Sequence, residues 1–137
     1  LVVGTYTLSV SPWATRIART SLLETASNKF NQTFKVEVNS LSNNVLHVDL
    51  AYYGNVYTSS PSTYGFNNAT SAACTSVDAG NGIGVGTGKV NSSLCTASTL
   101  LSGINQDNYV FADEVYFTPS AHRQFGTYAY DRLRARW

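Results

Sequence analysis

The order of predicted elements in the first 58 residues is the feature that most constrains the fold of this chain. Residues 1–8 are β-branched and aromatic, which predicts a strand buried on both faces, and residues 45–50 predict a second strand. A short helix is expected at residues 51–58. The longer helix between the two strands is predicted from apolar residues at helical spacing, which are Leu22, Leu23, Ala26, Phe30, Phe34 and Val38. A strand–helix–strand–helix order favours a parallel sheet with right-handed crossovers, so we expect an α/β fold.

Capping and breaking signals set the expected helix boundaries. Ser11 and Pro12 offer a cap and a first helical residue, and residues 21–24 read Ser-Leu-Leu-Glu, the pattern of a capping box. The long helix should then run to about residue 39, with its apolar stripe on the sheet. The Ser-Ser-Pro sequence at residues 59–61 should end the short helix.

Length, charge and residue types exclude several classes of function. With 137 residues the chain has the length of a single domain, and only 12% of its residues are charged, about half the usual share. A formal net charge of +1 gives no field that would gather nucleic acid, and no segment is long and apolar enough to cross a membrane. The two His and two Cys lack the spacing of a zinc site, so we expect no metal and no cofactor.

Two cysteines, Cys74 and Cys95, lie in a long irregular region that spans residues 67–108. An irregular loop of this length is usually functional or held to the domain by a cross-link, and a disulfide between these cysteines would be such a cross-link. By the chain-entropy argument, the bridge would stabilise the fold by roughly 3 kcal/mol or more. The pair favours an oxidising compartment, so we expect a secreted, extracellular protein.

The stretch at residues 109–125 carries the residues that could do chemistry. It reads as an extended apolar run, then Asp113, a short polar loop, and a helix that begins at Thr118 and Pro119 and carries His122. An Asp and a His brought together at the end of a strand are the orienting acid and general base of a hydrolase with a Ser or Cys nucleophile. Asp113 and His122 are therefore the candidate catalytic residues.

This stretch resembles the last conserved block of the GDSL/SGNH esterase and lipase family, which reads Asp-x-x-His-Pro-Thr-x-x-x-His. Aligned without gaps, Asp113 falls on the catalytic Asp, Thr118 on the Thr and His122 on the second His. Tyr116 stands where the family places its catalytic His, and Phe117 stands where it places Pro. The pairs Phe-Asn at residues 30–31 and Val-Asp at 48–49, and Tyr-Gly-Phe at 64–66, are similar to further family features.

The resemblance implies that residues 1–137 form a single domain, the C-terminal portion of a three-layer α/β/α hydrolase with a parallel sheet. It implies hydrolysis or transfer of a carboxylic ester, with lipid, steryl or short acyl esters as substrates, in a secreted bacterial enzyme. The family's Gly-Asp-Ser block and its oxyanion-hole blocks do not occur in this chain. We therefore expect the nucleophilic serine in a missing N-terminal half, which would act as a second-chain partner.

Each candidate residue also has a structural interpretation. Asp113 could cap its own turn through backbone N–H groups, and His122 could donate a hydrogen bond to a neighbouring loop. Tyr116 could be a wall-forming aromatic or a substitute for the base. His47 is expected in the core, and Asp49 is expected to cap the following helix. At the level of the whole protein, the alternatives are a non-catalytic carbohydrate- or ligand-binding module and a hydrolase relative that has lost activity.

Overall fold

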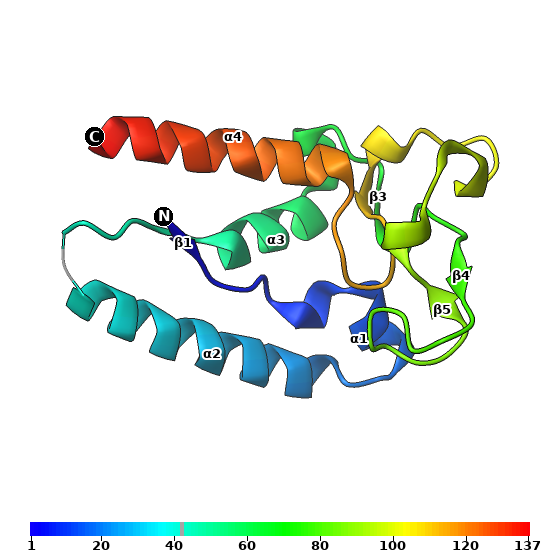
Figure 1. Ribbon diagram of the computed structural model, residues 1–137, viewed down its shortest axis with the longest axis horizontal. Helices are drawn as coiled ribbons and strands as arrows, with labels where there is room; N and C mark the ends of the chain where they lie inside the picture. The colour runs from blue at the N-terminus through cyan, green and yellow to red at the C-terminus, as the bar shows by residue number, and fades with distance from the viewer. Residues whose placement is uncertain (42) are drawn as a thin grey trace.

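The computed structural model describes residues 1–41 and 43–137 and has a mixed α/β fold (Figure 1). Helices α2 (Thr20–Leu41) and α4 (Pro119–Arg136) run along opposite sides of the molecule, and α3 (Leu50–Ser59) lies between them. The short helix α1 (Pro12–Arg16) precedes α2. The predicted α/β class is thus confirmed for the described residues.

Six strands form three two-stranded sheets in the described part of the chain. Two pairs are parallel and bring together segments that are distant in the sequence, whereas the third is an antiparallel hairpin. The pairs are β1 (Val2–Val3) with β2 (His47–Val48), β3 (Asn68–Ala72) with β6 (Tyr109–Phe111), and β4 (Val77–Asp78) with β5 (Lys89–Val90).

An aromatic core surrounds the β3–β6 pair. Val110 and Phe111 of β6 are completely buried, and Tyr57 of α3 packs edge-on against Phe66. Phe117, in the loop before α4, lies between the rings of Phe111 and Tyr6. The loop that carries Asp113 and leads to His122 in α4 is therefore built on the most deeply buried part of the molecule.

The N-terminal segment is less regular than the sequence indicates. Only residues 2 and 3 form a strand, they are half-buried, and residues 8–10 form a 3₁₀ helix, so the prediction of an eight-residue buried strand was wrong. The physical reason is that Asn31 of α2 takes the place of a strand partner. Its side-chain amide accepts a hydrogen bond from the Thr5 N–H at 2.9 Å and donates one to the Thr5 carbonyl at 2.7 Å.

Helix α2 also packs differently from the prediction. It begins at Thr20, which places Ser21 inside the helix, so the proposed capping box was wrong. Its buried residues are Ser27 and Val38, whereas Leu22 and Phe30 are 64% and 54% exposed. Hydrogen bonds to residues 5–8 turn a partly polar face of the helix inwards, and much of the predicted apolar stripe is left facing outwards.

Region 67–108 contains more structure than predicted. It includes strands β3, β4 and β5 and three short 3₁₀ helices at residues 92–94, 97–99 and 106–108. The predicted disulfide between Cys74 and Cys95 is present and is confirmed. It ties the end of β3 to the segment that follows β5.

Helices α3 and α4 begin at the caps that their sequences indicate. Asp49 caps α3 by accepting a hydrogen bond from the Tyr52 N–H, and the helix ends before Pro61. Thr118 caps α4, and Pro119 is its first residue. Within the described ranges, none of the helices combines the length and apolarity that crossing a membrane requires.

Candidate functional site

The candidate site lies at the carboxyl ends of the parallel strands β3 and β6. Cys74 follows β3 and Ala112 follows β6, and the Cys74 N–H donates a hydrogen bond to the Ala112 carbonyl at 3.0 Å. Ligands of α/β proteins bind most often at this end of a parallel sheet. Asp113 is the next residue along the chain, so the sheet geometry places it at the edge where chemistry is expected.

Asp113 is completely buried, and backbone N–H groups surround its carboxylate. Oδ1 accepts hydrogen bonds from Val115 N at 2.8 Å and Tyr116 N at 2.7 Å, and Oδ2 accepts one from Ser92 N at 3.0 Å. The carboxylate therefore caps its own turn, as the structural interpretation predicted, and it also holds the segment next to Cys95. A carboxylate offers about four acceptor positions, so three bonds leave one position for a further donor.

His122 occupies the first turn of α4, and its backbone N–H bonds to the Thr118 carbonyl at 3.0 Å. The ring centroid lies 5.9 Å from that of Phe117, and partial loss of hydration lowers the pKa of the imidazole from its ordinary value. Among residues 1–41 and 43–137, no side-chain hydrogen bond of His122 is formed, either to Asp113 or to a neighbouring loop. Asp113 and His122 thus come from the same loop–helix joint but are not hydrogen-bonded to each other.

A cavity of about 370 Å³ opens beside His122. Most of its wall is apolar, and the Cys74–Cys95 disulfide forms part of it. The volume falls within the range of small-molecule sites, which are mostly apolar with a few polar groups that fix orientation. Its other lining residues include Ser92, Gln106, Leu100, Phe117 and Thr118.

Tyr116 faces a second, shallower hollow on the other side of Ser92. Its side chain is 51% exposed, and it lines this hollow together with Gly82, Ile83 and Ser93. This is the position of a wall residue beside the Gly-rich loop, which spans residues 80–88. A role for Tyr116 as a substitute base stays a prediction.

Contacts from distant parts of the chain fix the loop between Asp113 and Phe117, and sequence patterns gave no sign of them. The Tyr6 hydroxyl donates to the Val115 carbonyl at 2.6 Å, and burial raises the pKa of this phenol. Arg16 pairs with Glu114 at 2.7 Å and also donates to the Val85 carbonyl of the Gly-rich loop at 2.9 Å. The loop is therefore tied to the N-terminal segment, to α1 and to the β4–β5 hairpin.

The other histidine, His47, lies outside the candidate site, and the possible metal ligands that the structure describes do not gather there either. His47 lies in β2, is only half-buried and so is not in the core as expected, and packs edge-on against Phe34 of α2. Within the described ranges, no three His, Cys, Asp or Glu side chains gather as metal ligands would.

No protein-family model matches this chain, and no curated protein is significantly similar to it. The likeness to the GDSL/SGNH family therefore rests on the motif residues at 113–122 and on the shorter features before them.

Proposed function

We propose that this chain is the C-terminal part of a secreted carboxylic-ester hydrolase of the GDSL/SGNH type, with a three-layer α/β/α fold. The observation that carries the proposal is the buried Asp113 carboxylate, which lies two residues after a parallel strand and one loop before a Thr-Pro helix start. This order of strand, Asp, loop and capped helix fits the family block that the sequence resembles. The Cys74–Cys95 disulfide is compatible with secretion.

In this proposal the reaction is acyl transfer to a serine that another segment supplies. The serine hydroxyl attacks the ester carbonyl, and a histidine takes the hydroxyl proton and returns it to the leaving alcohol. His122 is the histidine on the site side of the molecule, and the lowered pKa of its imidazole keeps it neutral and able to accept a proton near pH 7. Asp113 supplies the fixed negative charge at the strand end.

The cavity beside His122 fits the proposed substrate class. Its apolar wall and its volume of about 370 Å³ suit the acyl or alcohol part of an ester better than a highly charged ligand. Ser92, Thr96 and Gln106 add a few polar groups to the lining. We therefore expect uncharged or lipid-like esters as substrates.

A relative that binds esters without hydrolysing them is the second candidate, and two observations favour it. Tyr116 occupies the sequence position of the family's catalytic His, and all three hydrogen bonds of the Asp113 carboxylate come from backbone N–H groups. A lectin-like carbohydrate module is disfavoured, because such modules are mostly all-β whereas this chain contains long helices.

The first test is labelling of the native preparation with a fluorophosphonate probe, followed by mass spectrometry of every polypeptide present. The active-hydrolase proposal expects label on a serine of a co-purifying segment and hydrolysis of a p-nitrophenyl ester. An unlabelled, isolated chain without esterase activity would instead support the binding relative.

Matched variants then separate the candidate bases. His122→Gln should lower kcat at least a hundredfold if His122 is the base, since general-base catalysis contributes about that much. His47→Gln is the control and should leave kcat unchanged. If Tyr116→His raises activity while His122→Gln has no effect, the site is a decayed one whose base position is residue 116.

A further inference from the structure

Another large cavity lies at the opposite end of the molecule from the β4–β5 hairpin. Its volume is about 440 Å³, and residues from the C-terminal halves of α2 and α4 and from β2 and its flanking segments line it. Its lining is mostly polar, unlike that of the cavity beside His122. The side chains around it include Lys35, Asn39, His47, Asp49, Tyr128, Arg132 and Arg136.

The lining concentrates positive charge. Three of the chain's nine Lys and Arg residues, Lys35, Arg132 and Arg136, line this one cavity, against a single carboxylate, Asp49. One oxygen of Asp49 already accepts the Tyr52 N–H as the cap of α3. All three residues are exposed, so they can present their charges to an anion in this hollow, and each of them would attract it.

These cations have no ion-pair partner in the part of the chain that the structure describes. The ion pairs found there join Arg16 to Glu114 and Arg123 to Asp107, both away from this cavity. Lys35 and Arg132 make no side-chain hydrogen bond to any described residue. Their donor groups are therefore available to a ligand.

Arg136 is already held in place. Its guanidinium donates to the Asn43 carbonyl and lies 5.3 Å from the centre of the Trp137 ring. A guanidinium has five N–H donors, so one bond to the backbone leaves several for a second acceptor. Tyr128 adds a hydroxyl on the same side, and its ring packs against Tyr53 with centroids 4.4 Å apart.

We propose that this cavity binds a phosphate group, carried either by a soluble phosphoester or by a lipid headgroup. Arg presents forked donors that match phosphate oxygens, and Lys adds a compact positive charge. The cavity is larger than one phosphate needs, which leaves room for the group that the phosphate is attached to. The site uses none of the residues assigned to ester hydrolysis, so it stands or falls independently of the proposed function.

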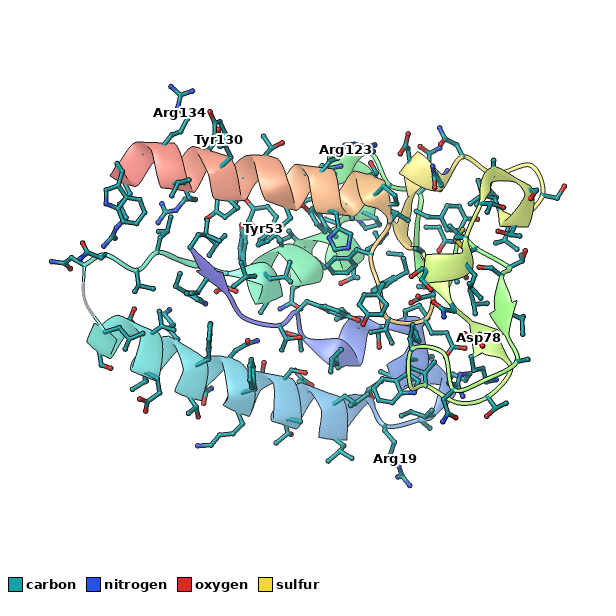
Figure 2. The ribbon with its side chains drawn as sticks, in the orientation of Figure 1. Arg19, Tyr53, Asp78, Arg123, Tyr130 and Arg134 are labelled. Atoms are coloured by element: carbon teal, nitrogen blue, oxygen red, sulfur yellow. A yellow bond between two sulfur atoms is a disulfide. The ribbon has the colours of Figure 1, made fainter. Side chains whose placement is uncertain are left out.

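Isothermal titration calorimetry with inorganic phosphate tests the site directly, at constant ionic strength. The unmodified chain should bind phosphate saturably, and a Lys35→Gln/Arg132→Gln variant should bind about tenfold more weakly or worse, because it loses two charged donors. The matched control is Lys29→Gln/Arg134→Gln, which removes two cations from the same helices outside the cavity. Arg134 points away from the body of the molecule in Figure 2, and the control should keep the affinity of the unmodified chain. Absence of saturable binding, or equal losses in both double variants, would overturn the proposal.

Flotation with vesicles that contain phosphatidic acid separates the two sources of the phosphate. Vesicle binding that depends on Lys35 and Arg132, and that inorganic phosphate competes away, identifies a lipid headgroup. Saturable phosphate binding without vesicle binding identifies a soluble phosphoester. Vesicle binding that weakens equally in both double variants, without saturable phosphate binding, would show diffuse surface attraction and contradict a built site.

Discussion

The two parallel strand pairs of this fold are stabilised in different ways. The β3–β6 pair lies inside an aromatic core, and Val110 and Phe111 of β6 are completely buried. The β1–β2 pair is only two residues long, its β1 residues are half-buried, and α2 meets the N-terminal segment through the polar side chains of Ser27 and Asn31. The comparison indicates that aromatic packing dominates on the site side of the molecule, whereas the other side combines the smaller buried residues Val38, Leu46 and Val48 with a few directed hydrogen bonds.

The largest expected effect contrasts two phenylalanines. Phe111→Ala removes a completely buried ring from β6, and we expect the free energy of unfolding to fall by about 3–5 kcal/mol. Phe30→Ala removes a ring that is 54% exposed on α2 and should cost less than about 1 kcal/mol. Urea denaturation of both variants measures the difference, and similar losses would contradict the contrast between the two regions.

The next effect concerns the buried carboxylate of Asp113. Asp113→Ala leaves the N–H groups of Ser92, Val115 and Tyr116 without their acceptor, which should destabilise the fold by about 3 kcal/mol or more. Asp113→Asn keeps one oxygen acceptor and should lose roughly half as much. Urea unfolding measures both losses, and an alanine variant as stable as the asparagine variant would show that these backbone groups find water instead.

A smaller effect is expected where α2 meets the N-terminal segment. Asn31→Ala breaks both bonds to the Thr5 backbone, and a loss of about 2 kcal/mol follows from two hydrogen bonds of ordinary strength. Gln32→Ala is the control, since Gln32 is the exposed neighbour on the same helix. Thermal unfolding followed by circular dichroism compares the two. If Asn31→Ala loses no more stability than Gln32→Ala, the contact between Asn31 and Thr5 contributes little to the stability of the fold.

The same contrast explains which elements could be predicted from the sequence. The caps at Ser11, Asp49 and Thr118 and the Cys74–Cys95 bridge were predicted correctly, because each depends on chemistry local to a few residues or on the only available pairing. The packing face of α2 was wrong, because it depends on hydrogen bonds from Ser27 and Asn31 to residues far away in the sequence. No periodicity of apolar residues encodes such bonds.

In the candidate site, too, the features local to a few residues could be predicted from the sequence, whereas the long-range contacts could not. The position of Asp113 after a strand followed from the apolar run before it, and Thr118 and Pro119 marked the helix that carries His122. The bond from Ser92 to Asp113 and the ties from Tyr6 and Arg16 to the loop could not be predicted, since they join segments from 21 to 109 residues apart. Strand β3 was also missed, because its sequence, Asn-Ala-Thr-Ser-Ala, lacks the large β-branched and aromatic residues that mark a strand.

Two buried tyrosines differ in whether their hydroxyl group is hydrogen-bonded, and we expect this difference to change stability by about 1 kcal/mol. The Tyr6 hydroxyl bonds to the Val115 carbonyl, whereas the Tyr57 hydroxyl is buried without a hydrogen-bond partner among the described residues. Burial raises the pKa of Tyr57 to about 12. Tyr6→Phe should therefore destabilise by about 1 kcal/mol, and Tyr57→Phe should be neutral or stabilising. A loss of stability in Tyr57→Phe, measured by urea denaturation, would show that its hydroxyl is bonded to water.

The smallest expected effect is a dependence of stability on pH through His122. Because partial burial lowers the pKa of His122 in the folded state, the unfolded chain, whose histidine titrates near 6.5, takes up the proton first as the pH falls. The stability that neutral His122 contributes is complete above about pH 6.5 and declines as the pH drops towards the lower folded-state pKa. His122→Gln should remove this part of the slope between pH 7.5 and 5, and His47→Gln should keep it. Urea midpoints across this range measure the slope. If the slope survives in His122→Gln, His122 is not its source. Water must then hydrate the imidazole fully, and His122 loses the main physical reason to remain a neutral base in the proposed hydrolase.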